Sequence, residues 1–182
     1  MTVFSTFVTA FFIIAIIILP FSSSHFRKNK NLIQSYWIVI LLYQVVAFTN
    51  AFWFRTLGAD MDAHSFHVLA ANISQVGEFQ FASDASLYKN ILGVLYWLTA
   101  PSHILGEQLS ILSIAISIIV FVKILDLLKL NRYQVPLVFI YAAQPTMLML
   151  GSITLREPFQ VLFVILAFYF GLKMKIFLKN KI

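Results

Sequence analysis

The sequence predicts an all-α integral membrane protein, with about five transmembrane helices and two amphipathic juxtamembrane helices in one external loop. The chain has 182 residues, of which 60% are hydrophobic and only 11% are charged. A soluble domain carries roughly 25% charged residues, so this chain has too few polar side chains to cover a soluble globule. The same composition excludes a disordered chain, and a sequence without cysteine excludes disulfides and zinc–thiolate sites.

Five apolar segments are long enough to cross a bilayer, and together they form one transmembrane domain over residues 1–182. About 20 helical residues, at about 1.5 Å per residue, cover roughly 30 Å of hydrocarbon. Gln144–Pro145 interrupts the fourth segment, where proline predicts a kink. The first apolar segment is expected to remain in the protein as a span and not to be cleaved as a signal peptide, because its basic cluster follows the apolar run. The predicted spans are residues 3–21, 35–54, 105–122, 135–153 and 159–178.

The basic residues favour one orientation of these spans. Residues 91–100 are apolar, but about 10–14 apolar residues are more typical of an interfacial segment than of a span. If this segment lies in the interface, ten of the 13 basic residues share one side of the membrane and six of the seven acidic residues share the other. A crossing would destroy that separation. The positive-inside rule therefore predicts the N-terminus outside and the C-terminus in the cytoplasm, in the inner (plasma) membrane.

The external loop, residues 55–104, is the long polar part of the chain. After Asp60, a good helix N-cap, apolar residues at helical spacing predict an amphipathic helix on the membrane surface. A second such helix follows, with Tyr88, Tyr96 and Trp97 expected at the headgroup level. The apolar stripe of the first helix is Phe66, Leu69, Ala70, Ile73 and Val76, and that of the second is Leu87, Ile91, Val94 or Leu95, and Leu98.

Two carboxylates and two imidazoles mark the start of the first loop helix. Asp60 and Asp62 are suited to bind a divalent cation, or one of them is suited to act as a general base toward an acceptor hydroxyl. His64 and His67 share a helix face, so they could join Asp60 as metal ligands or contact a phosphate or sugar. The alternative is a solvated helix start with surface histidines.

The turn between the last two spans, residues 151–158, lies on the same external side as the loop. Arg156 is suited to bind a lipid phosphate, because guanidinium matches phosphate in a bidentate geometry, and Glu157 would orient Arg156 or the acceptor. Interfacial anchoring of a helix end is the alternative. The turn can approach the first loop helix, which would place these residues in one external site.

This arrangement resembles the membrane glycosyltransferases of the GT-C fold, which use polyprenyl-phosphate sugars as donors. Residues 58–70, with Asp60 and Asp62, resemble the acidic motif of the first external loop in that superfamily. Residues 145–158 resemble its later proline–serine–glutamate segment, and residues 90–98 resemble its second juxtamembrane helix. The resemblance covers about residues 35–178.

The resemblance implies a hexosyltransferase-type enzyme that moves a sugar to a glycan or lipid acceptor outside the cytoplasm, as in the synthesis of cell-envelope polysaccharide. It makes Asp60 or Asp62 the catalytic carboxylate and Arg156 the contact to the donor phosphate. The substrate-binding residues are expected to be His64, His67, Arg156 and Glu157.

The implied partners are membrane lipids, the polyprenyl-phosphate sugar donor and the glycan or lipid acceptor, with no nucleic acid. A divalent cation is the one cofactor that the acidic motif suggests. Two alternatives stay open. One is a polysaccharide polymerase or ligase that uses a lipid diphosphate donor at the same face, and the other is a non-catalytic membrane subunit or a truncated fragment.

Overall fold

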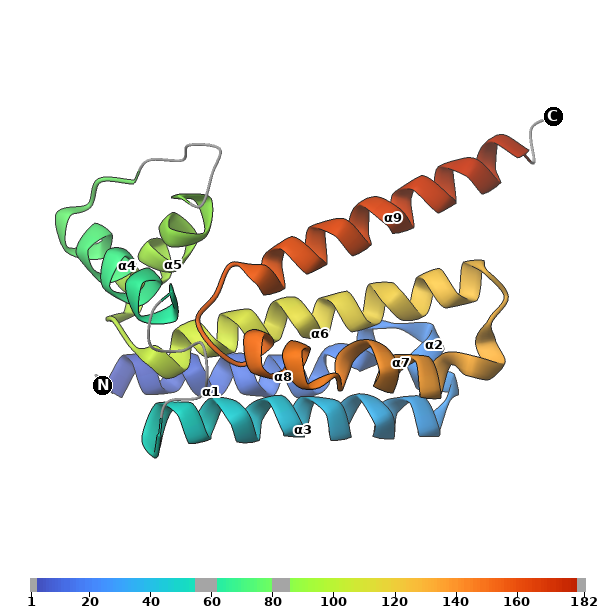
Figure 1. The fold of residues 1–182 in the computed structure, drawn as a ribbon, viewed down its shortest axis with the longest axis horizontal. Coiled ribbons are helices and arrows are strands. Elements are labelled where there is room, and N and C mark those ends of the chain that lie inside the picture. Colours follow the sequence, from blue (N-terminus) through green and yellow to red (C-terminus); the bar gives the residue numbers. More distant parts are fainter. Residues whose placement is uncertain (1–2, 55–61, 80–85, 180–182) are drawn as a thin grey trace.

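The computed structural model describes residues 3–54, 62–79 and 86–179, and regular structure within these ranges is helical throughout. Long helices run side by side along the molecule, and two shorter helices, α4 and α5, cover one end of them (Figure 1). The predicted class, an all-α membrane protein, is confirmed: four helices are long and apolar enough to cross a membrane, or five if one bent pair counts as a span.

The four continuous candidate spans are 20 to 25 residues long. Asn29 caps the second of them, because its Oδ1 accepts a hydrogen bond from the Leu32 backbone N–H at 3.2 Å. The spans are α1 (Val3–Ile18) with its extension η1 (Leu19–Ser22), α3 (Lys30–Phe52), α6 (His103–Leu127) and α9 (Glu157–Lys179). The short helix α2 (Ser24–Lys28) links the first two spans.

The fourth predicted span is broken into two helices. The 3₁₀ turn η3 (Asn131–Tyr133) leads into α7 (Gln134–Ala142), and α8 (Pro145–Gly151) follows at an angle of 64°. Gln144 has extended backbone angles (φ −63°, ψ 138°), as expected for a residue that precedes proline. The kink at Gln144–Pro145 is therefore confirmed, and the span predicted over residues 135–153 consists of two helices.

α4 (His64–Val76) and α5 (Ser86–Thr99) pack against each other at the end of the bundle (Figure 1). α5 has 14 residues, short of the length that a crossing needs, and it is not among the candidate spans. Gly77 ends α4 with a positive φ of 76°, and its N–H bonds to the Ile73 carbonyl at 2.9 Å. The five passes of α1, α3, α6, α7–α8 and α9 then alternate in direction (Figure 1).

The buried faces of α4 and α5 differ from the predicted stripes. On α5, Tyr88, Leu92 and Tyr96 are buried, whereas the predicted Leu87 and Leu98 are exposed. The two tyrosines are therefore not exposed to lipid headgroups as predicted, because they pack in a buried cluster with side chains of α1, α6 and α9, among them Phe12, Leu105 and Phe159. Trp97 remains exposed, and so do Leu69 and Val76 of the predicted α4 stripe.

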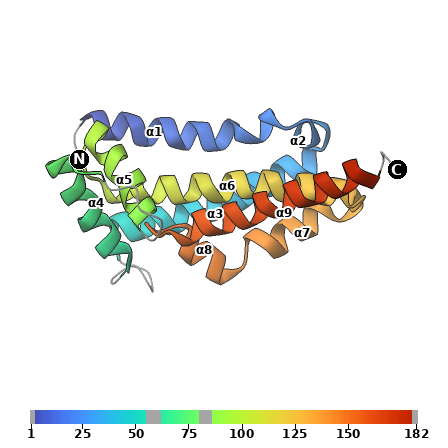
Figure 2. The same cartoon turned by 90° about the horizontal axis from the view of Figure 1, so that it is seen from above.

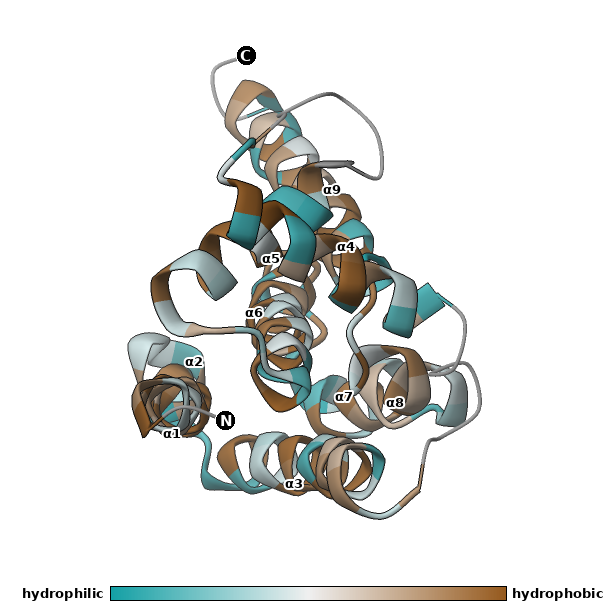
Figure 3. Cartoon of the chain, turned by 90° about the vertical axis from the view of Figure 1, so that its left-hand side faces the viewer, coloured by the Kyte–Doolittle hydropathy of each residue, from teal (hydrophilic) through white to brown (hydrophobic). Residues whose placement is uncertain are grey.

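α6 is the central helix of the bundle. In its most apolar stretch 72% of the residues are buried, against 6% in α9. Figure 3, seen from the end that carries α4 and α5, shows α6 surrounded by α1, α3, α7, α8 and α9, and Figure 2 shows α1 and α9 on opposite sides of α6. Polar contacts tie the helices together, since Tyr36 and Tyr43 donate hydrogen bonds to the carbonyls of Ile16 (2.7 Å) and Ala142 (2.9 Å).

Candidate functional site

Of the cavities at the end of the bundle where α4 begins, two are lined by a carboxylate side chain. The first, of about 130 Å³, is here called the histidine–glutamate cavity, and the second, of about 190 Å³, is called the cationic cavity. The histidine–glutamate cavity is lined by Asn50, Ala51, Ala63, His64, His103, Glu107 and Thr154. The cationic cavity is lined by Asp62, Ser65, Phe66, Leu69, Lys89 and Arg156.

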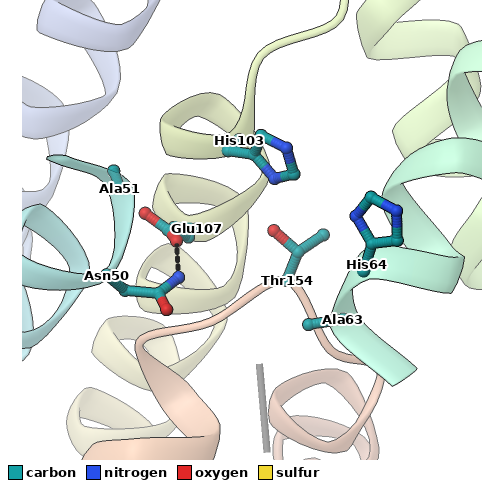
Figure 4. Close-up of a pocket in the computed structure, with 7 residues that line it drawn as sticks. All are labelled: Asn50, Ala51, Ala63, His64, His103, Glu107 and Thr154. Carbon is teal, nitrogen blue, oxygen red and sulfur yellow. Dashed lines mark hydrogen bonds between the residues drawn. The ribbon is translucent and has the colours of Figure 1, made fainter. Parts of the chain in front are cut away.

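The histidine–glutamate cavity collects side chains from four parts of the chain. Asn50 comes from the end of α3, His64 from the start of α4, and His103 and Glu107 from the first turns of α6, with Thr154 in the turn before α9. Figure 4 shows His64, His103 and Thr154 around one space, with Glu107 bonded to Asn50 beside it. The turn reaches α6 closely because residue 106 is glycine: a Cβ there would lie 2.8 Å from Thr154 Oγ1.

Glu107 is the most deeply buried charged residue of this site. Its side chain is 1% exposed, and Asn50 Nδ2 donates a hydrogen bond to Oε1. The second carboxylate oxygen, Oε2, is buried without a hydrogen-bond partner among the described residues. Burial of an acceptor that lacks a donor is costly, so such a group is common where a protein binds a ligand or a proton.

Three imidazoles form a cluster beside this cavity. The rings of His67 and His103 stack with centroids 3.6 Å apart, and those of His64 and His103 lie 6.3 Å apart. His67 Nδ1 lies 2.8 Å from the Tyr96 hydroxyl, which donates its one hydrogen to the Ser102 carbonyl at 3.0 Å. Nδ1 of His67 must therefore carry the hydrogen of that contact, which leaves the lone pair of the neutral ring on Nε2.

Burial, followed by the neighbouring charges of His103 and His64, lowers the pKa of His67 from 6.5 to about 4. His67 is thus a neutral imidazole at physiological pH. Its contact to Tyr96 fixes the orientation of the ring, so the α4 histidine and the α5 tyrosine act as one hydrogen-bonded unit.

The cationic cavity joins the start of α4 to the turn before α9. Arg156 and Lys89 bring two positive charges to it, and Asp62 brings a carboxylate. Ile153 of the turn is fully buried against Ala63, which holds the turn beside the start of α4. The predicted approach of residues 151–158 to the first loop helix is therefore observed.

The structure brings some predicted site residues together and separates others. Asp62 and Arg156 share the cationic cavity, whereas His64 lines the histidine–glutamate cavity and His67 stacks on His103. Glu157 begins α9, and its Oε1 lies 3.6 Å from Arg156 Nε. Asp60 lies outside the described residues.

Three members of the site were missed by the sequence analysis: Lys89, His103 and Glu107. In the sequence, Glu107 only weakens the start of an apolar run, and His103 only flanks it. Their spacing of four residues on one helix was the available signal, since residues i and i+4 share a helix face. Lys89 gave no local signal, because only the packing of α5 beside α4 brings it to Asp62 and Arg156.

A metal site is not formed by the described part of the chain, in which no group of three histidine, aspartate or glutamate residues is placed to hold an ion. The stacked rings of His67 and His103 explain this in part, because the nitrogen lone pairs lie in the ring planes and point past each other. The cation predicted for Asp60 and Asp62 stays a prediction, since Asp60 is not described.

These features define the class of the molecule: a multi-pass helical membrane protein with a polar site at one end of its bundle. The chain matches no protein-family profile, and comparison with curated proteins and with solved structures finds no similar chain. The resemblance to GT-C glycosyltransferases is not tested by these comparisons and stays a prediction.

Proposed function

We propose that this protein is glycosyltransferase-like and moves a sugar from a lipid-phosphate carrier to a glycan or lipid acceptor. One observation carries the proposal: Asp62, Lys89 and Arg156, which are far apart in the sequence, line one cavity at the end of a membrane-length bundle. A carboxylate beside two cations is the minimum set for activating a hydroxyl while holding a phosphate.

The cations would hold the phosphate of the donor. The Arg156 guanidinium offers paired N–H donors, and the Lys89 ammonium adds a point charge. Glu157, 3.6 Å from Arg156 Nε, would orient the guanidinium. Phe66 and Leu69 give the cavity an apolar wall suited to the lipid end of the carrier.

Asp62 would act as the general base, with Asp60 as the second candidate for that role. The base takes the proton of the acceptor hydroxyl as its oxygen attacks the anomeric carbon of the donor sugar. The bond from this carbon to the phosphate oxygen breaks, and the lipid phosphate leaves with the electron pair. Arg156 and Lys89 stabilise the charge on that phosphate, while His64 and His67 shape the acceptor side.

The proposed location is the extracytoplasmic face of the inner membrane. Ten of the 13 basic residues would lie at the opposite end of the bundle, in the cytoplasm, together with the C-terminus. The N-terminus, α4, α5 and both cavities would lie outside, where lipid-linked sugars are consumed.

The test is sugar transfer from a polyprenyl-phosphate sugar by the purified chain in proteoliposomes. We expect Asp62→Asn to lower kcat about 100-fold or more, since a general base contributes roughly 10²–10⁴-fold. Arg156→Lys should raise KM for the donor about 10-fold, because lysine cannot bind phosphate in a bidentate way. Glu78→Gln and Lys173→Gln, which change exposed residues away from both cavities, serve as matched controls.

Full activity of a variant that carries both Asp60→Ala and Asp62→Ala would contradict this mechanism. The products separate the two enzymatic alternatives. A transferase adds one sugar to each acceptor, whereas a polysaccharide polymerase or ligase extends or transfers a chain from a lipid diphosphate. A non-catalytic subunit would give no product with either donor.

A further inference from the structure

The histidine–glutamate cavity contains a buried carboxylate that the proposed transfer reaction does not use. Glu107 is 1% exposed, and one of its oxygens is bonded to Asn50. Oε2 has no hydrogen-bond partner among the described residues, and Glu107 lies in the first turns of α6, a helix long and apolar enough to span a membrane. A buried carboxyl group in such a position needs a ligand, a counter-charge or a bound proton.

The other residues of this cavity are suited to accept hydrogen bonds. Asn50 and Thr154 carry amide and hydroxyl oxygens, and an imidazole such as that of His64 or His103 accepts a hydrogen bond through one ring nitrogen in its neutral form. No lysine or arginine is among the described residues that line it. Lys89 and Arg156 line the cationic cavity instead, so the described lining of the histidine–glutamate cavity combines one carboxyl group with several hydrogen-bond acceptors.

A small cation with several N–H donors fits this chemistry better than a metal ion. The described residues contain no set of three metal ligands. A primary ammonium group has one charge for the single carboxylate and three donors for the neighbouring oxygens and nitrogens. We propose that the histidine–glutamate cavity binds a primary ammonium group, with Glu107 Oε2 as its anionic contact.

Two sources could supply this ammonium group at the membrane surface. One is the headgroup of an aminophospholipid such as phosphatidylethanolamine, and the other is an amino sugar. A quaternary ammonium group is excluded by the same chemistry, because it has no N–H to donate. The binding does not depend on sugar transfer, so it is tested separately by measuring ligand-dependent stability.

The first experiment compares the unfolding temperature of the full chain in nanodiscs of phosphatidylethanolamine with that in nanodiscs of phosphatidylcholine, at equal phosphatidylglycerol content. The two lipids differ mainly in the N–H donors of the headgroup. We expect the wild-type protein to be more stable with phosphatidylethanolamine, and Glu107→Gln to lose most of that difference. Glutamine keeps the acceptor for Asn50 but replaces Oε2 with an uncharged donor. Glu78→Gln, an exposed acid in a different position, should respond as the wild type does.

The second experiment adds glucosamine or N-acetylglucosamine to the protein in phosphatidylcholine nanodiscs. Stabilisation by glucosamine alone identifies an amino sugar as the source, and stabilisation by phosphatidylethanolamine identifies the lipid. In either case Glu107→Gln should weaken apparent binding at least about 10-fold, the factor for losing a charge-assisted hydrogen bond. Thr154→Val, which keeps the side-chain shape, should weaken it several-fold and provides a second variant if Glu107→Gln fails to fold. The proposal is overturned if neither ammonium compound stabilises the wild type, or if Glu107→Gln responds as the wild type does.

Discussion

The hydroxyl of Tyr96 joins α5 to both α4 and the start of α6. It accepts a hydrogen bond from His67 Nδ1 at 2.8 Å and donates one to the Ser102 carbonyl at 3.0 Å. Burial raises the pKa of Tyr96, so this hydroxyl keeps its proton and can serve both contacts. The protonation state of His67 therefore depends on the packing of α4 against α5 in the folded protein.

Acid should destabilise the protein through His67. Burial and the two nearby histidines lower the pKa of His67 from 6.5 to about 4 in the folded chain, so between these pH values only the unfolded chain binds the proton. Stability is then complete above pH 6.5 and falls as the pH drops toward 4. Because the ring is only half-buried, we expect a loss of about 1–2 kcal/mol.

Thermal unfolding in detergent between pH 7 and about pH 4 measures this loss. His67→Gln is the matched variant, since glutamine can still donate to Tyr96 but does not titrate in this range. A smaller pH dependence for His67→Gln than for the wild type supports the assignment. An identical pH dependence of the two proteins would show that other groups cause the loss.

Gly106 lies where α6 meets the turn before α9. A Cβ at this position would lie 2.8 Å from Thr154 Oγ1 and 3.0 Å from the Tyr96 hydroxyl. Gly106→Ala should therefore destabilise the protein by about 1–3 kcal/mol. Gly171→Ala is the control: nothing lies within 4 Å of its Cβ, and the higher helix propensity of alanine should leave stability unchanged or raised by up to about 1 kcal/mol. Equal unfolding temperatures for the two variants would contradict the close contact.

At the scale of elements, a pair of side-chain amides connects α3 to α6. Gln44 Nε2 donates to Gln108 Oε1 at 2.8 Å, and Gln108 Nε2 donates to Gln44 Oε1 at 2.9 Å. Gln108 is fully buried. In hydrocarbon, paired amides hold two helices in one register because an unpaired amide is costly there.

The two glutamines should show strong energetic coupling. Gln44→Leu leaves the buried amide of Gln108 without its partner, and we expect it to destabilise the protein by about 1–2 kcal/mol. The double variant Gln44→Leu, Gln108→Leu removes both amides and should be close to the wild type in stability. A double-mutant cycle on unfolding measures the coupling, expected at about 1 kcal/mol. Additive effects of the two substitutions would contradict it.

Both the local sequence and the tertiary contacts determine the break between α7 and α8. Pro145 predicts the interruption by itself, because it lacks an N–H and restricts the residue before it. The angle of 64° is set by tertiary contacts, including the hydrogen bond from the Tyr43 hydroxyl to the Ala142 carbonyl at 2.9 Å. The break turns the chain so that residues 152–155 are buried beside the start of α4.

For the whole molecule, the alternating direction of five passes places α4 and α5 at one end and α2 with the α6–α7 link at the other (Figure 1). The charge distribution predicts that the first end faces outward. The chain has no cysteine, so a single introduced cysteine reports its own side of the membrane. Asn72 on α4 and Asn131 in η3 are exposed positions at the two ends.

A membrane-impermeant maleimide should label Asn72→Cys in intact cells and label Asn131→Cys only after the membrane is made permeable. The cysteine-free parent chain is the control for background labelling. Labelling of both variants in intact cells, or of Asn131→Cys alone, would contradict the proposed orientation and move both cavities to the cytoplasmic side.

Much of the bundle could be predicted from the sequence, because crossing a membrane requires about 20 apolar residues and proline interrupts a helix wherever it occurs. The faces of α4 and α5 could not be predicted in the same way. Apolar and aromatic side chains lie on more than one face of α5, so the choice of Tyr88, Leu92 and Tyr96 as the buried face depends on the helices that α5 meets.

The residues of the candidate site likewise fall into those that could be predicted from the sequence and those that only the packing of helices reveals. The sequence by itself determined a helical membrane protein, the kink at Pro145, and Asp62, His64 and Arg156 as polar residues near one end of the spans. Only the tertiary structure decided that Lys89 joins Asp62 and Arg156, and that Glu107 is buried beside His64 and His103. The physical reason is distance along the chain. The length of an apolar segment and the position of a helix break depend on consecutive residues, whereas a cavity is formed by side chains that meet only after the helices pack.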